Sequence, residues 1–277
     1  MIEVIAPGPY ATVQDLGRPG LAHLGVPRSG AADAPSLRLA NRLVGNREDA
    51  AAIEVTFGLA RLRFHEGAWA ALTGAPAQAR MGAPFWVPPG GELRLGTPGW
   101  GLRTYVAVRG GIAVEPVLGS RSTDSLSGLG PEPLRAGTLL PVGGSAAGEI
   151  SVDLAPPPGP APAVLRVLAG PRDDWFVPGA LEALCGGPYE VSQDSNRVGV
   201  RLRGPELRRA RKGELPSEGM VTGAVQVPPS GQPIVFLADH PPTGGYPVIA
   251  VVRQADLPVA AQLRPGDQVR FTTRPGL

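Results

Sequence analysis

The chain has 277 residues, 43% of them hydrophobic and 18% charged, with a formal net charge of +2 at pH 7. This length suffices for one large or two small domains, and the hydrophobic fraction argues against disorder despite 39 glycines and 33 prolines. A single cysteine excludes an internal disulfide and any metal site built from several thiolates. Arginines spread along the chain without interleaved aromatic residues disfavour a nucleic-acid groove.

No hydrophobic stretch reaches the roughly 20 residues that a membrane-spanning helix needs. Residues 1–15 lack the basic region and the following apolar region of a secretory signal. We therefore expect a cytoplasmic protein that has no membrane partner.

The first half of the chain predicts short strands and one helix. A strand is expected over Met1–Ile5, and a glycine-rich loop with little periodicity follows over Thr12–Asp33. A helix is predicted over Asp33–Gly45, because an aspartate can cap its start and a glycine can stop it. Short apolar runs then alternate with turn signals about every ten residues, as in a sandwich or barrel. These predicted strands are Ile53–Phe57, Ala60–Phe64, Trp69–Thr73, Phe85–Val87, Glu92–Leu95, Leu102–Val108 and Thr138–Val142.

A proline-rich segment, residues 155–162, is typical of a stiff linker. It divides the chain into an N-terminal β-rich domain, residues 1–154, and a C-terminal domain, residues 163–277, which we expect to carry the main site. A helix is predicted over Asp173–Leu184. The strands predicted in this domain are Val164–Leu168, Tyr189–Gln193, Val198–Leu202, Ala224–Val227, Ile234–Ala238, Val248–Val252 and Gln268–Thr272.

Residues 214–252 carry the most informative pattern, because polar side chains sit at or near the ends of its apolar runs. Side chains at strand ends project from a rigid scaffold, a placement that binding sites favour. The polar residues of this stretch are Ser217, Glu218, Gln226, Asp239, Thr243 and Tyr246.

The same stretch, SEGMVTGAVQVPPSGQPIVFLADHPPTGGYP at residues 217–247, resembles the PxpC/KipA family. Its members are the PxpC component of bacterial 5-oxoprolinase and the second half of the urea carboxylase carboxyltransferase, also called allophanate hydrolase subunit 2. Further blocks resemble the family in the same order, so the resemblance covers essentially the whole chain. Among them are TVQDLGRPG (12–20), GVPRSGAAD (25–33), LANRLVGN (39–46), RVGVRLRGP (197–205) and QLRPGDQVRF (262–271).

The resemblance implies a mainly β protein with two cyclophilin-like β-barrel domains, each with one or two short helices. It also implies a subunit of an ATP-dependent 5-oxoprolinase, which hydrolyses 5-oxo-L-proline to L-glutamate. The implied partners are two further subunits, one KipI-like and one LamB/YcsF-like, with ATP bound with or by them, and activity is expected only in the complex. Two alternatives stay open: a carboxyltransferase component of a biotin-dependent, urea-type carboxylase, or a KipA-like regulator that antagonises a KipI-like kinase inhibitor.

A small planar amide needs donors at its oxygen and an acceptor for its N–H. We predict catalytic roles for Asp239, Gln226 and Tyr246. Asp239 ends an apolar run, where partial burial would raise its pKa toward a useful range; the alternative is a turn aspartate that bonds its own backbone. Gln226 faces either a ligand or solvent.

The predicted substrate-binding set combines two arginines with the residues around the two turns. Arg197 and Arg201 lie four residues apart on one predicted strand, so both should point to one face. That face could instead be solvated, and the turn residues could form only a cap or a hairpin. The full set is Arg197, Arg201, Ser217, Thr243, Gly244 and Gly245.

Gln14, Asp15 and Arg18 form a possible interface or second site. Asp15 and Arg18 could equally form a structural ion pair that pins the loop. The polar loop at residues 119–130, GSRSTDSLSGLG, could cradle a phosphate or form a buried network, and the network is favoured.

Several motifs are absent from the sequence. There is no phosphate-binding P-loop and no nucleophile elbow. The histidines are far apart, so no metal is predicted. Lys212 is the single lysine and lies outside any biotinylation tripeptide, so no covalent biotin is expected on this chain.

Overall fold

The computed structural model describes residues 1–78, 80–144, 148–157, 159–160, 162–211, 213 and 215–274. The chain falls into two compact units, each of which is discontinuous in sequence. The first contains Met1–Arg18, Ser29–Asp124 and Gly128–Pro160. The second contains Pro19–Arg28, Ser125–Ser127 and the described part of Ala161–Leu277. The predicted boundary at residues 155–162 includes residues 158 and 161, which lie outside the described residues.

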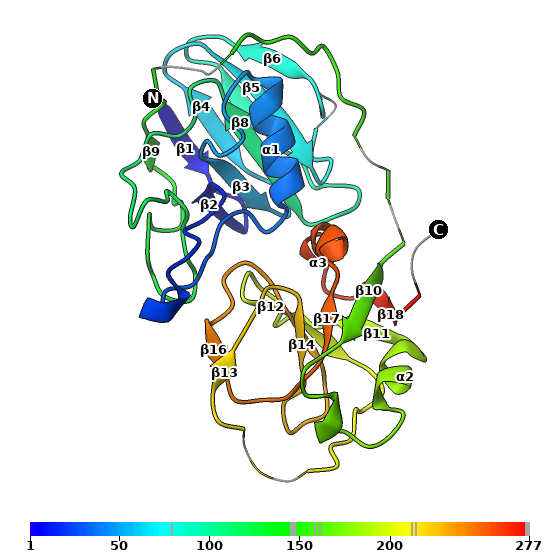
Figure 1. The fold of residues 1–277 in the computed structure, drawn as a ribbon. Coiled ribbons are helices and arrows are strands. Elements are labelled where there is room, and N and C mark those ends of the chain that lie inside the picture. The colour runs from blue at the N-terminus through cyan, green and yellow to red at the C-terminus, as the bar shows by residue number, and fades with distance from the viewer. Residues whose placement is uncertain are drawn as a thin grey trace. The chain divides into compact units, whose positions relative to one another are not determined.

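In the first unit, antiparallel pairing builds two sheets (Figure 1). One sheet has the order β7-β4-β1-β9, with β7 Glu92–Arg94, β4 Arg61–Phe64, β1 Ile2–Ala6 and β9 Leu139–Leu140. The other has the order β2-β3-β8-β5-β6, with β2 Tyr10–Gln14, β3 Ala52–Thr56, β8 Arg103–Val108, β5 Ala68–Gly74 and β6 Pro84–Val87.

The two sheets share one hydrophobic core, to which Val4 and Leu62 contribute from one sheet and Val106 from the other. Helix α1, Ala34–Leu43, covers the opposite face of the five-stranded sheet, where Leu37 packs with Tyr105 (Figure 1). Strand β8 is consequently buried along its whole length. A strand that is covered on both faces tends to be apolar without alternation, and residues 105–108 of β8 follow this pattern, whereas Arg103 and Thr104 are buried polar residues.

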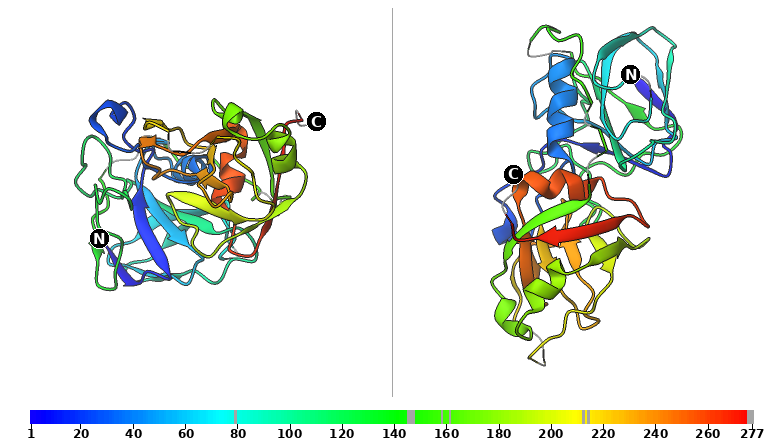
Figure 2. Two further views of the ribbon diagram at one scale, coloured as in Figure 1. Left: turned by 90° about the horizontal axis from the view of Figure 1, so that it is seen from below. Right: turned by 90° about the vertical axis from the view of Figure 1, so that its right-hand side faces the viewer.

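In the described residues of the second unit, seven strands close a barrel in the order β10-β17-β14-β15-β12-β11-β18 (Figure 2). Neighbouring strands are antiparallel except β10 and β18, which are parallel. The strands are β10 Val164–Ala169, β17 Val248–Val252, β14 Ala224–Gln226, β15 Ile234–Phe236, β12 Gly199–Arg203, β11 Pro188–Val191 and β18 Gln268–Thr272.

Two short helices and a two-stranded ribbon complete this unit. Helices α2, Ala180–Cys185, and α3, Leu257–Ala261, add side chains to the barrel core. Strand β13, Glu218–Gly219, pairs with β16, Thr243–Gly244, in a separate antiparallel ribbon. We call this pair the β13–β16 ribbon.

The mainly β fold is confirmed, with the closed barrel in the second unit. The helix predicted over Asp33–Gly45 is confirmed, and Asp33 caps it by accepting a hydrogen bond from the Ser36 amide at 3.1 Å. The helix predicted over Asp173–Leu184 is wrong as one element, because Gly179 has a φ of 83° and separates a 3₁₀ turn from α2.

The structure also corrects the start of the loop that was predicted over Thr12–Asp33. Its first residues belong to β2, which pairs along its whole length with β3. Polar residues in Tyr10–Gln14 hid this strand from a search for apolar runs. The missed α3 is only five residues long and too short to show a helical period.

Candidate functional site

The outer face of the barrel carries a row of side chains that cross four strands. Gln226 pairs with Ile234 on β15 and Val248 on β17, and Ile234 pairs in turn with Arg201 on β12. Residues directly paired in an antiparallel sheet project to the same face. The neighbouring Val225 belongs to the barrel core, so this row lies on the outside.

The β13–β16 ribbon packs closely on this row at Gln226, which is only 5% exposed. The Gln226 Nε2 donates to the carbonyl of Tyr246 at 3.1 Å and lies 3.9 Å from the sulfur of Met220. A Cβ on Gly244 would come within 2.8 Å of the same nitrogen, so this approach requires glycine. Gln226 is therefore held beneath the ribbon, not turned to solvent.

A salt bridge ties the ribbon to the rest of the second unit. Both carboxylate oxygens of Glu218 accept hydrogen bonds from Arg172. These bonds lower the pKa of Glu218 below its ordinary value. Ser217 and Thr243 are exposed at the ribbon edge.

Tyr246 follows the ribbon and is 39% exposed. The guanidinium carbon of Arg209 lies 5.6 Å from the centre of the Tyr246 ring. The Arg209 Nη2 donates to the carbonyl of Val227 at 2.5 Å. Gln226, Gly244, Gly245, Tyr246 and Arg209 thus form one group, which we call the ribbon cluster.

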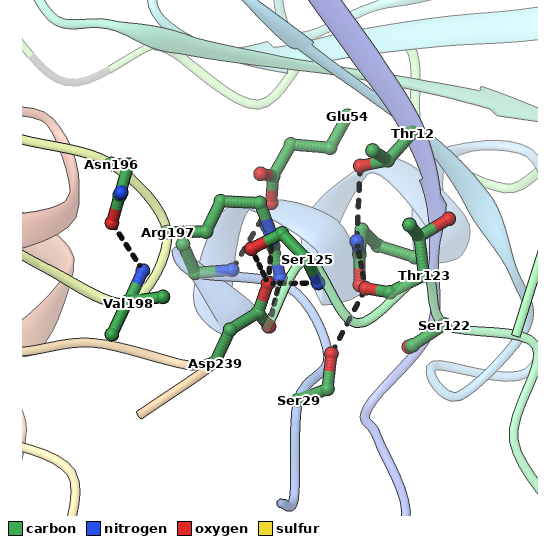
Figure 3. Close-up of polar contacts among 12 residues, drawn as sticks. Thr12, Ser29, Glu54, Ser122, Thr123, Ser125, Asn196, Arg197, Val198 and Asp239 are labelled. Carbon is green, nitrogen blue, oxygen red and sulfur yellow. Dashed lines mark hydrogen bonds and ion pairs between the residues drawn. The ribbon is translucent and has the colours of Figure 1, made fainter. Parts of the chain in front are cut away.

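A second cluster in the same unit is buried and built around Asp239 (Figure 3). Arg197 donates to both carboxylate oxygens of Asp239, at 2.9 and 3.0 Å. The backbone N–H and the hydroxyl of Ser125 donate to Oδ2 at 2.9 and 2.7 Å. Asp239 has no exposed surface and Arg197 is 2% exposed, so this is a desolvated and well-bonded ion pair.

The expected rise in the pKa of Asp239 is wrong. Burial alone would raise its pKa, but the charge of Arg197 and the hydrogen bonds from Arg197 and Ser125 outweigh burial. The net result is a pKa below the ordinary value for aspartate. Asp239 is therefore ionised at neutral pH, and its catalytic role stays a prediction.

The two arginines predicted to share a face do not do so. Arg197 precedes β12 and turns inward to Asp239, whereas Arg201 lies within β12 and is exposed. The Asp239 cluster and the ribbon cluster are also distinct. Gln226 pairs with the first residue of β15, whereas Asp239 follows the last residue of that strand, Phe236, by three positions.

The residues proposed as an interface or second site lie in the first unit, in a buried polar network. Gln14 donates to the Thr12 hydroxyl at 3.0 Å and to the Thr123 carbonyl at 2.9 Å. The Ser29 hydroxyl donates to the same carbonyl at 3.0 Å. This network fixes the end of β2 against the loop that contains Thr123.

Asp15 and Arg18 hold that loop from two sides instead of pairing with each other. Asp15 accepts hydrogen bonds from the hydroxyls of Ser120 and Ser122, both at 2.6 Å, and from the Arg121 amide. Arg18 donates to the Ser122 carbonyl at 2.5 Å. The hydroxyls of Ser120 and Ser122 are both used in this network, which agrees with the favoured interpretation of residues 119–130 as part of a buried network.

The first unit also has a hollow of about 360 Å³, away from the predicted residues. Trp69 and Trp86 line it with their rings 5.9 Å apart, together with Arg109. Among the described residues, no group of three or more histidine, cysteine, aspartate or glutamate side chains is arranged to hold a metal ion. No helix in the described part of the chain is long and apolar enough to cross a membrane.

Sequence reasoning missed Arg209 and Ser125 as members of these clusters. Arg209 lies in the segment RRARK at residues 208–212, where four of five residues are basic, a pattern that could have indicated an anion site. Ser125 lies in the polar loop that was predicted to form a network. The aspartate that it bonds is more than a hundred positions away in sequence, so no local pattern could pair them.

Comparison with known proteins places the chain among carboxyltransferase domains and their relatives. Residues 24–273 match the family model described as carboxyltransferase domain, subdomain A and B. The chain is 40% identical to the C subunit of 5-oxoprolinase from Escherichia coli, with 98% of this chain and 90% of that protein covered. It is 36% identical to the urea amidolyase of Lachancea kluyveri, but covers only 17% of that protein.

Solved structures of similar proteins support the same family assignment. The urea amidolyase of K. lactis superposes with a TM-score of 0.90 at 32% identity, over 98% of this chain and 18% of that chain. TTHA0988 superposes with a TM-score of 0.88 at 41% identity, over 98% of this chain and 55% of that chain. The chain thus spans about half of one solved relative and under a fifth of the other.

Proposed function

Because the chain belongs to the family of carboxyltransferase domains with subdomains A and B, we propose that it is a subunit of an ATP-dependent 5-oxoprolinase. One observation carries the proposal: the alignment with the C subunit of E. coli 5-oxoprolinase covers 98% of this chain and 90% of the relative. The urea amidolyase alignment covers a small part of a much longer protein. The aligned region therefore accounts for most of that C subunit and for only a small part of the urea amidolyase.

The reaction is the hydrolysis of 5-oxo-L-proline to L-glutamate. Its difficulty is the amide, because resonance makes the carbonyl a poor electrophile. In our proposal ATP, bound with or by the partner subunits, transfers its γ-phosphoryl group to the amide oxygen and leaves as ADP. Water then adds to the activated carbon, the C–N bond of the ring breaks to give the amine of glutamate, and inorganic phosphate leaves. Two partner subunits are proposed, one KipI-like and one LamB/YcsF-like.

The ribbon cluster supports a role in holding the amide. Gln226 positions the turn that would hold the amide, because its Nε2 donates to the carbonyl of Tyr246 from beneath the ribbon. The turn at Gly244 and Gly245 lets a ligand approach the backbone closely. Tyr246 offers a partly exposed ring against which a flat molecule can pack.

Asp239 is the proposed proton acceptor because it is ionised, and since its oxygens accept hydrogen bonds from Arg197 and Ser125, it would take up a proton only by giving up one of these bonds. Replacing it with asparagine tests this role. If Asp239→Asn in the reconstituted complex retains the wild-type turnover number, the role is refuted.

The function itself is tested by offering the complex two substrates. The chain is combined with its partner subunits and ATP, and then given either 5-oxo-L-proline or urea with bicarbonate. Formation of glutamate from the lactam supports the proposal. Partner binding without turnover of any amide points instead to the regulatory alternative.

The second candidate is a carboxyltransferase component that moves a carboxyl group from carboxybiotin to an amide. The superposition on a urea amidolyase at a TM-score of 0.90 favours it. It requires a separate biotinylated partner. Carboxylation of urea that depends on a copurifying biotin protein would support this candidate over the first.

A further inference from the structure

Arg209 is a partly buried cation that is held from two sides. Its Nη2 donates to the Val227 carbonyl at 2.5 Å, and its guanidinium lies over the ring of Tyr246. Its Nε is buried and has no hydrogen-bond partner. The backbone of Arg209 forms a bridge with Phe176, which fixes the base of the side chain.

Other arginines of this unit that are partly or fully buried and form ion pairs differ from Arg209. Each of them has a carboxylate: Arg166 with Asp256, Arg172 with Glu218 and Arg197 with Asp239. In the described part of the chain, Arg209 has no carboxylate within ion-pair distance. Burial lowers the pKa of Arg209, and the neighbouring Tyr246 partly opposes this shift.

A partly buried guanidinium whose Nε has no hydrogen-bond partner stabilises an anion that reaches it. The Arg209 guanidinium and the Tyr246 ring are also held in place before any ligand binds. Tyr246 cannot drift from Arg209 freely, because Gln226 holds its carbonyl and Val227 donates to the carbonyl of Pro247 at 3.0 Å. A guanidinium held in this way loses little freedom on binding a carboxylate.

We propose that Arg209 and Tyr246 form a carboxylate-binding site beside the β13–β16 ribbon, which holds the carboxylate of the lactam substrate. This inference rests on the proposed function and assigns the carboxylate contact to a residue outside the predicted set. Arg197 is less suited, because its two donor edges already serve Asp239. Arg201 is exposed and keeps its water, so it gains less from an anion.

The site discriminates between two lactams. 5-Oxo-L-proline has a carboxylate, and 2-pyrrolidinone is the same ring without it. With the carboxylate on Arg209, the ring can lie against the exposed part of Tyr246. Recognition of the charge should therefore appear in the Michaelis constant for 5-oxo-L-proline and be absent for 2-pyrrolidinone.

The test uses Arg209→Gln and Arg209→Lys in the complex with the partner subunits. Loss of a charged hydrogen-bonding partner predicts a KM for 5-oxo-L-proline about 10- to 100-fold higher in Arg209→Gln, with kcat changed by less than about threefold. Arg209→Lys should recover part of the loss, since it keeps the charge but not the planar fork. Kinetics with 2-pyrrolidinone should not respond to either change.

Arg208→Gln is the matched control, because Arg208 is exposed and only its backbone carbonyl has a described hydrogen bond, from Val177. It should leave both substrates unaffected. An unchanged KM for 5-oxo-L-proline in Arg209→Gln overturns the inference. So does an equal loss with both lactams together with a lower melting temperature, which would show that Arg209 only supports the fold.

Direct binding separates failure of the site from failure of the proposed function. The full chain is titrated with 5-oxo-L-proline and with 2-pyrrolidinone by calorimetry. Binding of only the carboxylated lactam, abolished in Arg209→Gln, supports the site even if the wild-type complex forms no glutamate. Equal binding of 5-oxo-L-proline by wild type and Arg209→Gln contradicts it, whatever the complex catalyses.

Discussion

The buried ion pair between Asp239 and Arg197 should be a main support of the second unit. The carboxylate accepts two hydrogen bonds from Arg197 and two from Ser125, and neither charged side chain is more than 2% exposed. Asp239→Asn removes the negative charge and turns one acceptor into a donor that faces other donors. Leaving one charge of a buried pair uncompensated costs about 3–5 kcal/mol.

Native-state hydrogen exchange measures this loss locally, in the amides of β14 and β15. The free energy of opening in these strands should fall by about 3–5 kcal/mol in Asp239→Asn. The control is Asp194→Asn, because Asp194 is 72% exposed and lies 3.7 Å from Arg203. That change should alter the same amides by less than about 0.5 kcal/mol.

A double variant checks the physical reason. Replacing Asp239 with leucine and Arg197 with methionine removes both charges, so it should destabilise these strands less than either single change. A loss under about 1 kcal/mol in Asp239→Asn, or a double variant worse than the sum of the singles, would refute the assignment of stability to this pair.

Three further changes probe the ribbon, the first helix and the ribbon salt bridge. Gly244→Ala should reduce kcat/KM by displacing Gln226, since the new Cβ would lie 2.8 Å from the Gln226 Nε2. Gly219→Ala in the same ribbon is the control, because its Cβ would meet nothing within 4 Å and the change should be neutral. Steady-state kinetics of the two variants test this difference. Asp33→Ala removes a helix cap and should lower the free energy of unfolding by about 1 kcal/mol in urea titrations. The pKa of Glu218 is lowered in the folded state, so the stability that its salt bridge contributes is fully present above the unfolded pKa of about 4.3. This stability is lost as the pH falls through the lower folded pKa. Glu218→Gln should therefore flatten that part of the plot of unfolding free energy against pH.

The elements that could be predicted are those whose signal is local. The helix after Asp33 has its cap, its apolar stripe and its stop within a dozen positions, and the structure keeps all three. The barrel strands are short β-branched runs between glycines and prolines, and nearly all were placed correctly. The helices and strands were predicted from local patterns of apolar, turn and capping residues. The resemblance to a known family was identified from sequence blocks that occur in the same order along the chain.

The contacts within the site could not be predicted, because they depend on pairing across the sheet. Whether Asp239 is free or bound is decided by Arg197 and Ser125, which come to it from other parts of the chain. Similarly, the position of Gln226 beneath the ribbon follows from the pairing of β13 with β16. Neither pairing leaves a signal in the sequence near the residue that it affects.

The most direct measurement is the rate of glutamate formation when increasing amounts of this chain are added to fixed amounts of the two partner subunits with 5-oxo-L-proline and ATP. We predict no glutamate without the chain and a rate that rises until the chain equals its partners. A full rate in the absence of the chain, or none at any amount of it, would contradict the assignment.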